Sequence, residues 1–200
     1  MGEQFKEENY IMKTTQPIRN RNQIRALAEY YLKRGQIRNY VLIVMSLYTA
    51  LRISDLLRIR WDDVYDFANK RVRPSITIRE GKTGKSKTIA LNTRIIKALT
   101  LYLHVASPER HVIMNKNTGN AISRIQAYRL IRTAAEALKL QNNVSCHSLR
   151  KTFGYHAWKS GVSPAVIMEI YNHSSMSITR RYLGISQDDK DEVYLGLNLI

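Results

Sequence analysis

The sequence predicts a mainly α-helical domain with a small antiparallel β-sheet, an α+β fold. Most segments repeat apolar residues at intervals of three and four, which is the spacing of an amphipathic helix. Residues 75–91 instead alternate apolar and polar side chains around a turn with two glycines, which is the pattern of a β-hairpin. The chain has 200 residues, the length of one domain, and shows no internal repeat or interdomain linker.

Two helices and a short third one are expected after a loose leader at residues 1–19. Residues 22–33 have helical spacing, and Gly35 follows as a C-terminal stop. Residues 37–49 are more apolar, which predicts a buried helix. Ser54 is then expected to cap a short helix whose two leucines point inward.

The hairpin follows and is the most cationic part of the chain. Residues 75–79 form the first expected strand, residues 81–84 (Gly-Lys-Thr-Gly) the turn, and residues 87–91 the return strand. Between residues 70 and 97 there are nine Lys or Arg and one acid, Glu80. A solvated face normally mixes the two signs, so this run favours contact with phosphates.

Five further helices are expected in the C-terminal half. A residue that can cap the first turn, or a glycine or proline that stops the helix, marks their ends. A short apolar piece at residues 112–114 and a turn at residues 117–120 separate the first of these helices from the second. The expected helices start at Thr93, at Ser123, near Ser148 (running to Lys159), at the Ser163–Pro164 pair, and after Ser177.

Charge is the most informative property of the composition. Lys and Arg number 32 against 16 Asp and Glu, which gives a net charge of +16 and a pI near 10.1. Basic proteins also bind RNA, ribosomes and acidic membranes, but the charge and the lack of membrane signals favour a nucleic acid. No run of 18 apolar residues occurs, and the polar N-terminus is not a secretory signal. The single cysteine, Cys146, cannot form an internal disulfide, so a reducing cytoplasm is the expected location.

The residues with the clearest chemistry begin with a His-x-x-Arg box. On a helix, His147 and Arg150 stand three positions apart and share one face. An imidazole beside a guanidinium suits a phosphate group, because one moves a proton while the other neutralises charge. A second histidine, His173, and then Tyr182 follow at spacings short enough to fold back over that face.

With Arg52 and Lys82 in the same order ahead of this box, the chain resembles the catalytic domain of the tyrosine recombinases, the phage-integrase family. The resemblance covers about residues 20–184 and implies the fold of that domain, with residues 185–200 as a C-terminal tail. Typical relatives carry a separate N-terminal helical domain, and only about twenty residues precede the matching region here. The chain therefore resembles the short, invertase-like members of the family.

The resemblance implies a set of cations around a DNA phosphate. Arg52 and Arg150 would form the two halves of a clamp on the non-bridging oxygens. Lys82, in the hairpin turn, would donate a proton to the departing 5′ oxygen. Lys85 and Lys87 are rivals for that role, although Lys82 best fits the Lys-Thr-Gly of the family.

The resemblance also implies a nucleophile and its helpers. Tyr182 stands nine residues after His173, where the family places the attacking tyrosine, and its phenol has to be activated because its ordinary pKa is about 10. His147 would carry a proton or donate to the phosphate. Asn172 replaces the glycine that relatives show before the second histidine, and asparagine tolerates the left-handed backbone that glycine adopts.

Supporting and DNA-contacting residues are less sharply defined. Asp55 occupies an acidic position of the family, where it would support the arginine or a histidine, or would simply be a carboxylate at a helix start. Arg180 and Arg181 would sharpen the environment of the tyrosine or touch DNA. The expected DNA contacts are Arg79, Lys85, Lys87, Arg180 and Arg181.

These expectations together predict a site-specific recombinase that acts on double-stranded DNA. It would cleave through a 3′-phosphotyrosine and exchange strands within a tetramer, in integration, excision or inversion. The rivals are a type IB topoisomerase, which shares the reactive set, and a non-catalytic basic DNA-binding protein. No zinc spacing and no nucleotide phosphate loop occur, so neither a metal, a cofactor nor a small-molecule substrate is expected.

The C-terminal tail predicts an assembly contact. Its acidic cluster at residues 188–192 would repel DNA, so the tail should point away from the phosphates. Val193, Leu197 and Ile200 then form an apolar stripe. In the family such a tail packs onto a neighbouring subunit, which predicts a head-to-tail contact; the alternative is that the stripe folds back onto its own core.

Overall fold

The fold is mainly helical with small antiparallel sheets, as the sequence predicts. The structure is a computed structural model that describes residues 15–106, 108–140, 143–185 and 187–198. No helix in these ranges is long and apolar enough to cross a membrane. The elements in chain order are α1 (Arg21–Leu32), α2 (Ile37–Tyr48), α3 (Ile53–Leu56), α4 (Trp61–Val64), β1 (Tyr65–Asp66), β2 (Arg71–Val72), β3 (Ser75–Arg79), β4 (Ser86–Ala90), α5 (Thr93–Leu103), α6 (Arg124–Ala137), α7 (Cys146–Lys159), α8 (Pro164–Tyr171), α9 (Met176–Leu183) and α10 (Gln187–Gly196).

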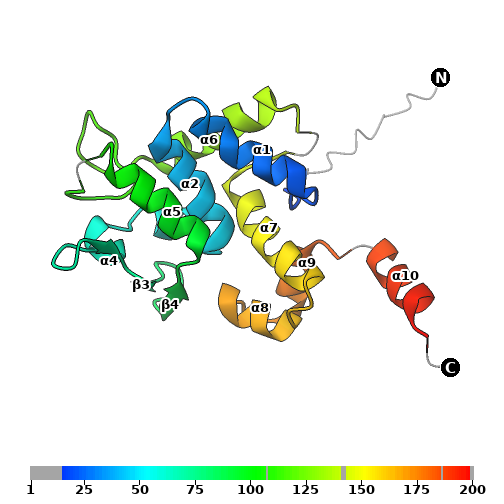
Figure 1. The fold of residues 1–200 in the computed structure, drawn as a ribbon. Helices are drawn as coiled ribbons and strands as arrows, with labels where there is room; N and C mark the ends of the chain where they lie inside the picture. Colours follow the sequence, from blue (N-terminus) through cyan, green and yellow to red (C-terminus); the bar gives the residue numbers. More distant parts are fainter. Residues whose placement is uncertain (1–14, 107, 141–142, 186, 199–200) are drawn as a thin grey trace, which may run out of the picture.

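Helix α2 is the centre of the larger part of the molecule. Residues 41–47 are all buried, and the helix packs against α1, α5 and α7 (Figure 1). A helix that is apolar on nearly every side is stable only when other elements cover it. One side of α2 joins a core with Trp61 and α5, and the other joins a core between α1, α6 and α7.

The predicted hairpin is confirmed as the antiparallel pair β3–β4. Its register pairs Ser75 with Ala90 and Arg79 with Ser86, and the hydroxyls of Thr77 and Thr88 face each other across the strands at 2.9 Å. A second two-stranded sheet, β1–β2, precedes it. The sequence pattern did not predict that sheet, because its strands are two residues long and carry no alternation.

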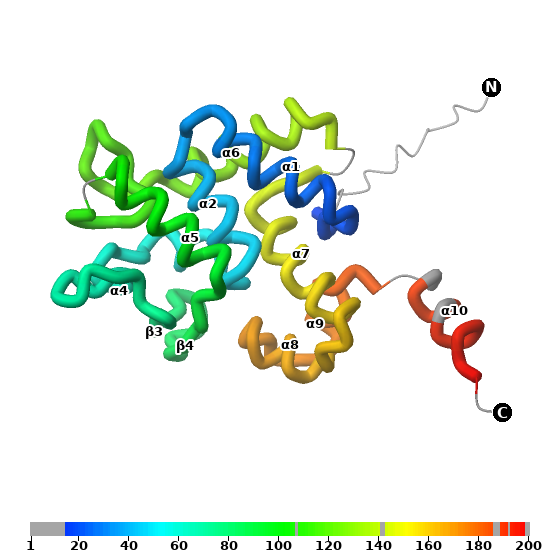
Figure 2. Tube along the Cα trace, viewed as in Figure 1, coloured from blue at the N-terminus to red at the C-terminus, as the bar shows by residue number. Residues whose placement is uncertain are grey.

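Helices α8 and α9 form a group with the end of α7 below the α2 core in the view of Figure 1. Helix α7 also packs against α2 and so connects the two parts. A small core of Ile167, Tyr171 and Leu183 holds this group together, and it includes Ala50 from the turn after α2. Figure 2 shows that α10 projects away from the other helices. The turn after α2 is thus packed against the C-terminal helices, which brings Arg52 close to their residues.

Two helix starts are confirmed and four differ from the expected residues. Ser123 and Ser163 are the N-caps of α6 and α8. The other four N-caps lie one to three residues earlier than expected. In three of these helices a capping-type side chain stands earlier in the sequence; Asn92, for example, accepts from the backbone N–H groups of Arg94 and Ile95. Arg52, at the start of α3, makes no side-chain cap hydrogen bond. The observed N-caps are Arg52 in place of Ser54, Asn92 in place of Thr93, Ser145 in place of Ser148, and Ser175 in place of Ser177.

The end of the expected loose leader is packed rather than loose. Residues 1–14 lie outside the described residues. Ile18 is 3% exposed, and its backbone N–H donates to the hydroxyl of Thr152 on α7 at 2.9 Å. Residues 15–19 therefore belong to the packed body of the protein, because an apolar side chain and a backbone hydrogen bond hold them against α7.

Candidate active site

The expected site residues meet at the C-terminal end of α8, where this helix lies against α7, α9 and the β3–β4 hairpin. Arg150 comes from α7, Tyr182 from α9, and His173 from the turn after α8. Arg52 comes from the start of α3. Four separate elements therefore supply one cluster of polar side chains.

Arg150 is held inside this cluster by backbone carbonyls. Its side chain is only 1% exposed, and its two Nη groups donate to the carbonyl of Ala50 and, at 3.0 Å, to the carbonyl of Tyr171. The guanidinium carbon also lies 4.6 Å from the centre of the Tyr171 ring. The Nε of Arg150 has no hydrogen-bond partner among the described residues, which leaves one buried donor unused.

The turn after α2 is shaped to reach Arg150. Ala50 is fully buried and has a φ of 55°, a left-handed conformation that side chains other than glycine rarely adopt. This conformation directs its carbonyl toward Arg150 and leads the chain into Arg52 two residues later. The two arginines of the expected clamp are thus linked through three residues of backbone.

Tyr182 lies among the two histidines and the cations. Its hydroxyl is 3.4 Å from Nδ1 of His147, and its ring centre is 4.8 Å from the His147 ring and 4.5 Å from the His173 ring. Arg150 and Lys151 lie 6.0 Å and 5.7 Å from the centre of the same ring. The hydroxyl of Tyr182 therefore lies next to an imidazole nitrogen and its ring lies close to two cations, the kinds of group that activate a nucleophilic hydroxyl.

Both histidines are held in the neutral form. Burial, then the positive charge of Arg150 and Arg52, lowers the pKa of His173 to about 4. The pKa of His147 is also lowered, by burial and then by Lys151 and the two arginines. At neutral pH both imidazoles are uncharged in the free protein and can accept a proton.

The turn between α8 and α9 fixes His173. Asn172 adopts φ 52° and ψ 42°, the left-handed conformation expected where relatives carry glycine. The His173 backbone N–H donates to the carbonyl of Met168 at 3.1 Å, and its ring Nδ1 lies 3.0 Å from the hydroxyl of Thr179. The ring is therefore held at both ends, which orients it toward Tyr182.

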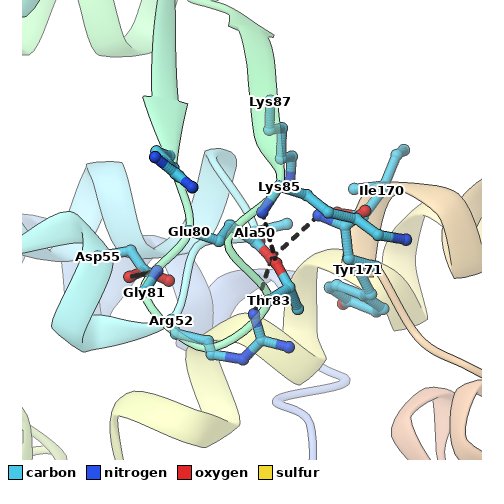
Figure 3. A network of polar contacts seen from close by, with 12 residues as sticks. Ala50, Arg52, Asp55, Glu80, Gly81, Thr83, Lys85, Lys87, Ile170 and Tyr171 are labelled. Atoms are coloured by element: carbon cyan, nitrogen blue, oxygen red, sulfur yellow. Dashed lines mark hydrogen bonds and ion pairs between the residues drawn. The ribbon is translucent and has the colours of Figure 1, made fainter.

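Arg52 forms an ion pair with a buried acid. Its Nη1 lies 3.0 Å from Oε2 of Glu80, a residue that is 0% exposed at the end of β3. The same oxygen accepts from Thr83 at 2.9 Å and from the side-chain amide of Asn172 at 2.9 Å. Burial alone would raise the pKa of Glu80, but the donors Asn172, Thr83 and Arg52 outweigh it and lower that pKa below its ordinary value. Figure 3 shows this network at the hairpin turn.

The contacts of Asp55 connect this residue to the hairpin turn. Its Oδ1 accepts from Arg58 at 2.8 Å and from the backbone N–H of Gly81 at 3.0 Å. The side chain is thus bound to the first residue of the hairpin turn, while the expectations were a support for Arg52 or a histidine, or a carboxylate at a helix start. The N-cap of α3 is Arg52, two residues earlier than predicted, so Asp55 lies in the first turn of this helix.

The three hairpin lysines lie in different surroundings. Lys82 and Lys85 are exposed in the turn. Lys87 on β4 points inward, and its Nζ donates to the carbonyl of Ile170 at 2.5 Å (Figure 3). Burial, and then the charge of Arg150, lowers the pKa of Lys87 to about 8. The structure therefore brings Lys87, rather than Lys82, next to the buried cluster.

The comparison with known families decides what this cluster belongs to. The sequence model of the Phage integrase family matches residues 19–188. The chain belongs to the phage integrase family. It is 35% identical over 183 residues to the probable integrase/recombinase YoeC of Bacillus subtilis, and the match covers 92% of this chain and 97% of YoeC. The protein is therefore a tyrosine-type site-specific recombinase.

Solved structures agree with this integrase fold. The XerA recombinase has a TM-score of 0.73 at 21% identity, over 92% of this chain and 66% of that chain. The XerH recombinase bound to its palindromic difH substrate has a TM-score of 0.71 at 19% identity, over 92% of this chain and 52% of that chain. The chain also spans about half the length of a curated relative, the tyrosine recombinase XerD of Corynebacterium glutamicum, which is 27% identical and is covered for 52%.

The remaining expected residues of this integrase lie around the cluster. Arg79, Lys85, Arg180 and Arg181 are exposed, as contacts to a large polyanion would require, whereas Lys87 is turned inward. In the described part of the chain, no group of three or more His, Cys, Asp or Glu side chains is placed to hold a metal ion.

Two residues that contact the cluster were not expected from the sequence. Lys151 follows Arg150 directly, lies beside the Tyr182 ring and donates from its Nζ to the carbonyl of Thr15 at 2.6 Å. Glu80 was seen only as the single acid of a cationic run. The sequence signal for Glu80 was its position as the one acid in a segment with nine Lys or Arg, because such an acid has many possible partners for an ion pair.

Proposed function

We propose that this protein cleaves DNA with Tyr182, forms a 3′-phosphotyrosine, and exchanges strands between two duplex sites. The observation that carries the proposal is the position of the Tyr182 hydroxyl, 3.4 Å from His147, in a ring that also contacts His173 and lies over Arg150. Twelve tyrosines occur in the chain, and this one combines the family position with an adjacent base and adjacent cations.

In the proposed reaction the Tyr182 oxygen forms a bond to the phosphorus, and the bond from the phosphorus to the 5′ oxygen breaks. The phenol proton passes to a neutral histidine, His147 or His173. A proton from the ammonium of Lys82 passes to the departing 5′ oxygen. Strand exchange reverses these steps with the 5′ hydroxyl of another strand. The phosphotyrosine bond conserves the energy of the cleaved phosphodiester bond until then.

Arg52 and Arg150 are proposed to stabilise the charge that develops on the non-bridging oxygens. The unpartnered Nε of Arg150 supports this role, because both Nη groups already hold backbone carbonyls. Arg52 is half-buried and contacts Glu80 through Nη1. Asp55 supports the hairpin turn through Gly81.

Covalent capture tests the proposal as a whole. Footprinting on the genomic DNA around its own gene would first locate a binding site. A nicked duplex of that site, from which the cleaved end diffuses away, should then accumulate a protein–DNA adduct that survives denaturation. Footprinting without any adduct would instead support a non-catalytic DNA-binding protein, and relaxation of supercoiled DNA without a preferred site would support a topoisomerase.

The lysine assignment gives a separate prediction. Lys82→Ala should slow cleavage by at least about a hundredfold, which is the usual loss of rate when a general acid is removed. A substrate with sulfur at the bridging 5′ position should restore the rate, because a thiolate leaves without being protonated. Lys87→Ala should also slow cleavage, but sulfur should not restore it, since Lys87 is engaged with Ile170. Restoration of Lys87→Ala alone would transfer the acid role to Lys87.

DNA and further copies of this chain are the proposed partners. The exposed residues Arg79, Lys85, Arg180 and Arg181, together with the net charge of +16, support binding to the backbone of duplex DNA. We propose a catalytic domain at residues 20–184 that assembles as a tetramer on two sites. The proposal of a short, invertase-like member is supported by the 97% coverage of YoeC.

Helix α10 is proposed to pack onto a neighbouring subunit. Its first turns are bound to its own body, because Asp189 pairs with Lys159 of α7 at 2.8 Å. Beyond that point Val193, Tyr194 and Leu195 are 63%, 80% and 87% exposed, so this apolar segment is left uncovered. Ile200, the end of the expected stripe, lies outside the described residues.

Removal of the tail tests this assembly. A chain lacking residues 187–200 should bind one half-site with little change and fail to form a synaptic tetramer, as measured by gel shift and analytical ultracentrifugation. Replacement of Tyr194, Leu195 and Leu197 by serine should have the same effect while it keeps the Asp189–Lys159 pair. Loss of the folded state in both variants, without a separate loss of assembly, would mean that the tail belongs to its own core.

A further inference from the structure

The C-terminal end of α8 connects three parts of the site through three successive residues. The carbonyl of Ile170 accepts from Lys87 of the hairpin at 2.5 Å, and the carbonyl of Tyr171 accepts from Arg150 at 3.0 Å. The side chain of Asn172 donates to Glu80 at 2.9 Å. The last carbonyls of a helix have no partner within the helix, and cations are favoured there. Side chains of the proposed reaction centre thus donate hydrogen bonds to the free carbonyls at this helix end.

Glu80 is the other end of that connection. Its Oε2 accepts from Arg52, from Thr83 and from Asn172 at 2.9–3.0 Å, and its side chain is fully buried. A buried carboxylate is costly unless donors surround it, so the three donors are held to it in turn.

The hairpin turn that carries Lys82 is built on Glu80. The backbone N–H of Glu80 donates to the carbonyl of Lys85 at 3.0 Å, and the N–H of Gly84 donates to the carbonyl of Glu80 at 2.8 Å. Thr83, next to Lys82, donates from its hydroxyl to the same carboxylate. Glu80 therefore holds the backbone of the turn that carries the exposed Lys82, together with the contact of Asp55 with Gly81.

We propose that Glu80 and Asn172 form a positioning pair that holds the Lys82 turn against the turn after α8, so that the lysine reaches the departing 5′ oxygen. The inference rests on the proposed function and adds two residues that act through Lys82 without touching the DNA. Asn172 has two roles in it: its backbone takes the left-handed conformation of the turn, and its amide makes the connection. Glycine at this position can fill only the first role.

The pair acts on the lysine more than on the histidine. His173 keeps two anchors of its own, to the Met168 carbonyl and to Thr179. Arg52 loses no direct contact when Asn172 is changed, because its partner Glu80 remains. The turn with Lys82, in contrast, is connected to the C-terminal end of α8 by the hydrogen bond between Asn172 and Glu80. The other contact between the hairpin and this helix end is made by Lys87, which lies on β4 and not in the turn.

Asn172→Gly is the sharpest variant, because glycine accepts a φ of 52° without strain and removes only the amide. It should keep the melting temperature and the DNA affinity of the unchanged protein and slow adduct formation by about tenfold or more. On a substrate with a bridging 5′ sulfur its rate should return to that of the unchanged protein. Lys139→Gly makes the same backbone change at an exposed left-handed residue after α6 and should leave both rates unchanged.

Glu80→Gln provides a second, shape-conserving variant. Its amide oxygen still accepts from Asn172, so the cleavage rate should lie between those of the unchanged protein and Asn172→Gly, again with restoration by sulfur. The double variant should be no slower than Asn172→Gly alone, because both changes act on the same connection. A normal rate for Asn172→Gly on ordinary DNA overturns the inference, and so does a slow rate that sulfur leaves unrestored. Absence of any adduct with the unchanged protein would instead refute the proposed function.

Discussion

Tyr182→Phe should bind DNA normally and form no covalent adduct on a nicked substrate. The substitution removes one oxygen and keeps the ring, which packs against His147, His173 and Tyr171 at centre distances of 4.5–5.4 Å. The hydroxyl makes a long contact of 3.4 Å to His147, so its loss should cost little stability. This variant should therefore lose adduct formation without losing stability.

The neighbouring tyrosine cannot replace Tyr182 in this arrangement. Tyr171 is 0% exposed, and its hydroxyl donates to the carbonyl of Arg150 at 2.5 Å. Burial also raises its pKa above the ordinary value, which opposes ionisation. Tyr128→Phe, an exposed residue of α6 with no assigned role, is a suitable control and should form adduct at the normal rate. An adduct formed by Tyr182→Phe would show that another tyrosine is the nucleophile.

The sequence predicted the parts of this fold that local pattern controls. The alternation at residues 75–79 and the glycines of the turn gave the hairpin with the correct partner strand. The left-handed backbone of Asn172 followed from the chemistry of asparagine. N-caps were displaced by up to three residues, because Asn92, Ser145 and Ser175 compete with nearby residues as caps and only tertiary packing selects among them.

The sequence did not predict which side chains from distant elements contact each other. The sequence pattern predicts that the hairpin lysines Lys82, Lys85 and Lys87 are all exposed. The contact of Lys87 with Ile170, 83 positions away, depends on how α8 packs against β4. The partner of Asp55 changed for the same reason, since Gly81 approaches it from another element. Residue types therefore predicted the reaction, whereas the supporting contacts required the fold.

The two clamp arginines should differ sharply when each is removed. Arg52→Ala should slow cleavage by at least about a hundredfold, the usual effect of one lost charge donor in a preorganised site. Its half-buried side chain makes one ion pair, with Glu80, which keeps Thr83 and Asn172 as partners. Folding should survive, and Arg52→Lys should recover part of the rate while it keeps the charge beside Glu80.

Arg150→Ala should lose cleavage to a similar degree and also lose stability. It leaves the buried carbonyls of Ala50 and Tyr171 without donors, at a cost of about 1–3 kcal/mol each, and it removes the cation above the Tyr171 ring. A melting temperature lower by several degrees in Arg150→Ala, but not in Arg52→Ala, would separate the two roles.

DNA affinity should change little in either arginine variant, because many other cations hold the backbone and each phosphate contact adds about one unit to the salt dependence. Rates of adduct formation, binding constants at two salt concentrations and thermal melts on the same preparations measure the three quantities. Binding and cleavage that fall in equal proportion would mean that the arginines only anchor DNA. A normal melting temperature for Arg150→Ala would mean that its carbonyl contacts do not hold α7, α8 and the turn after α2 together.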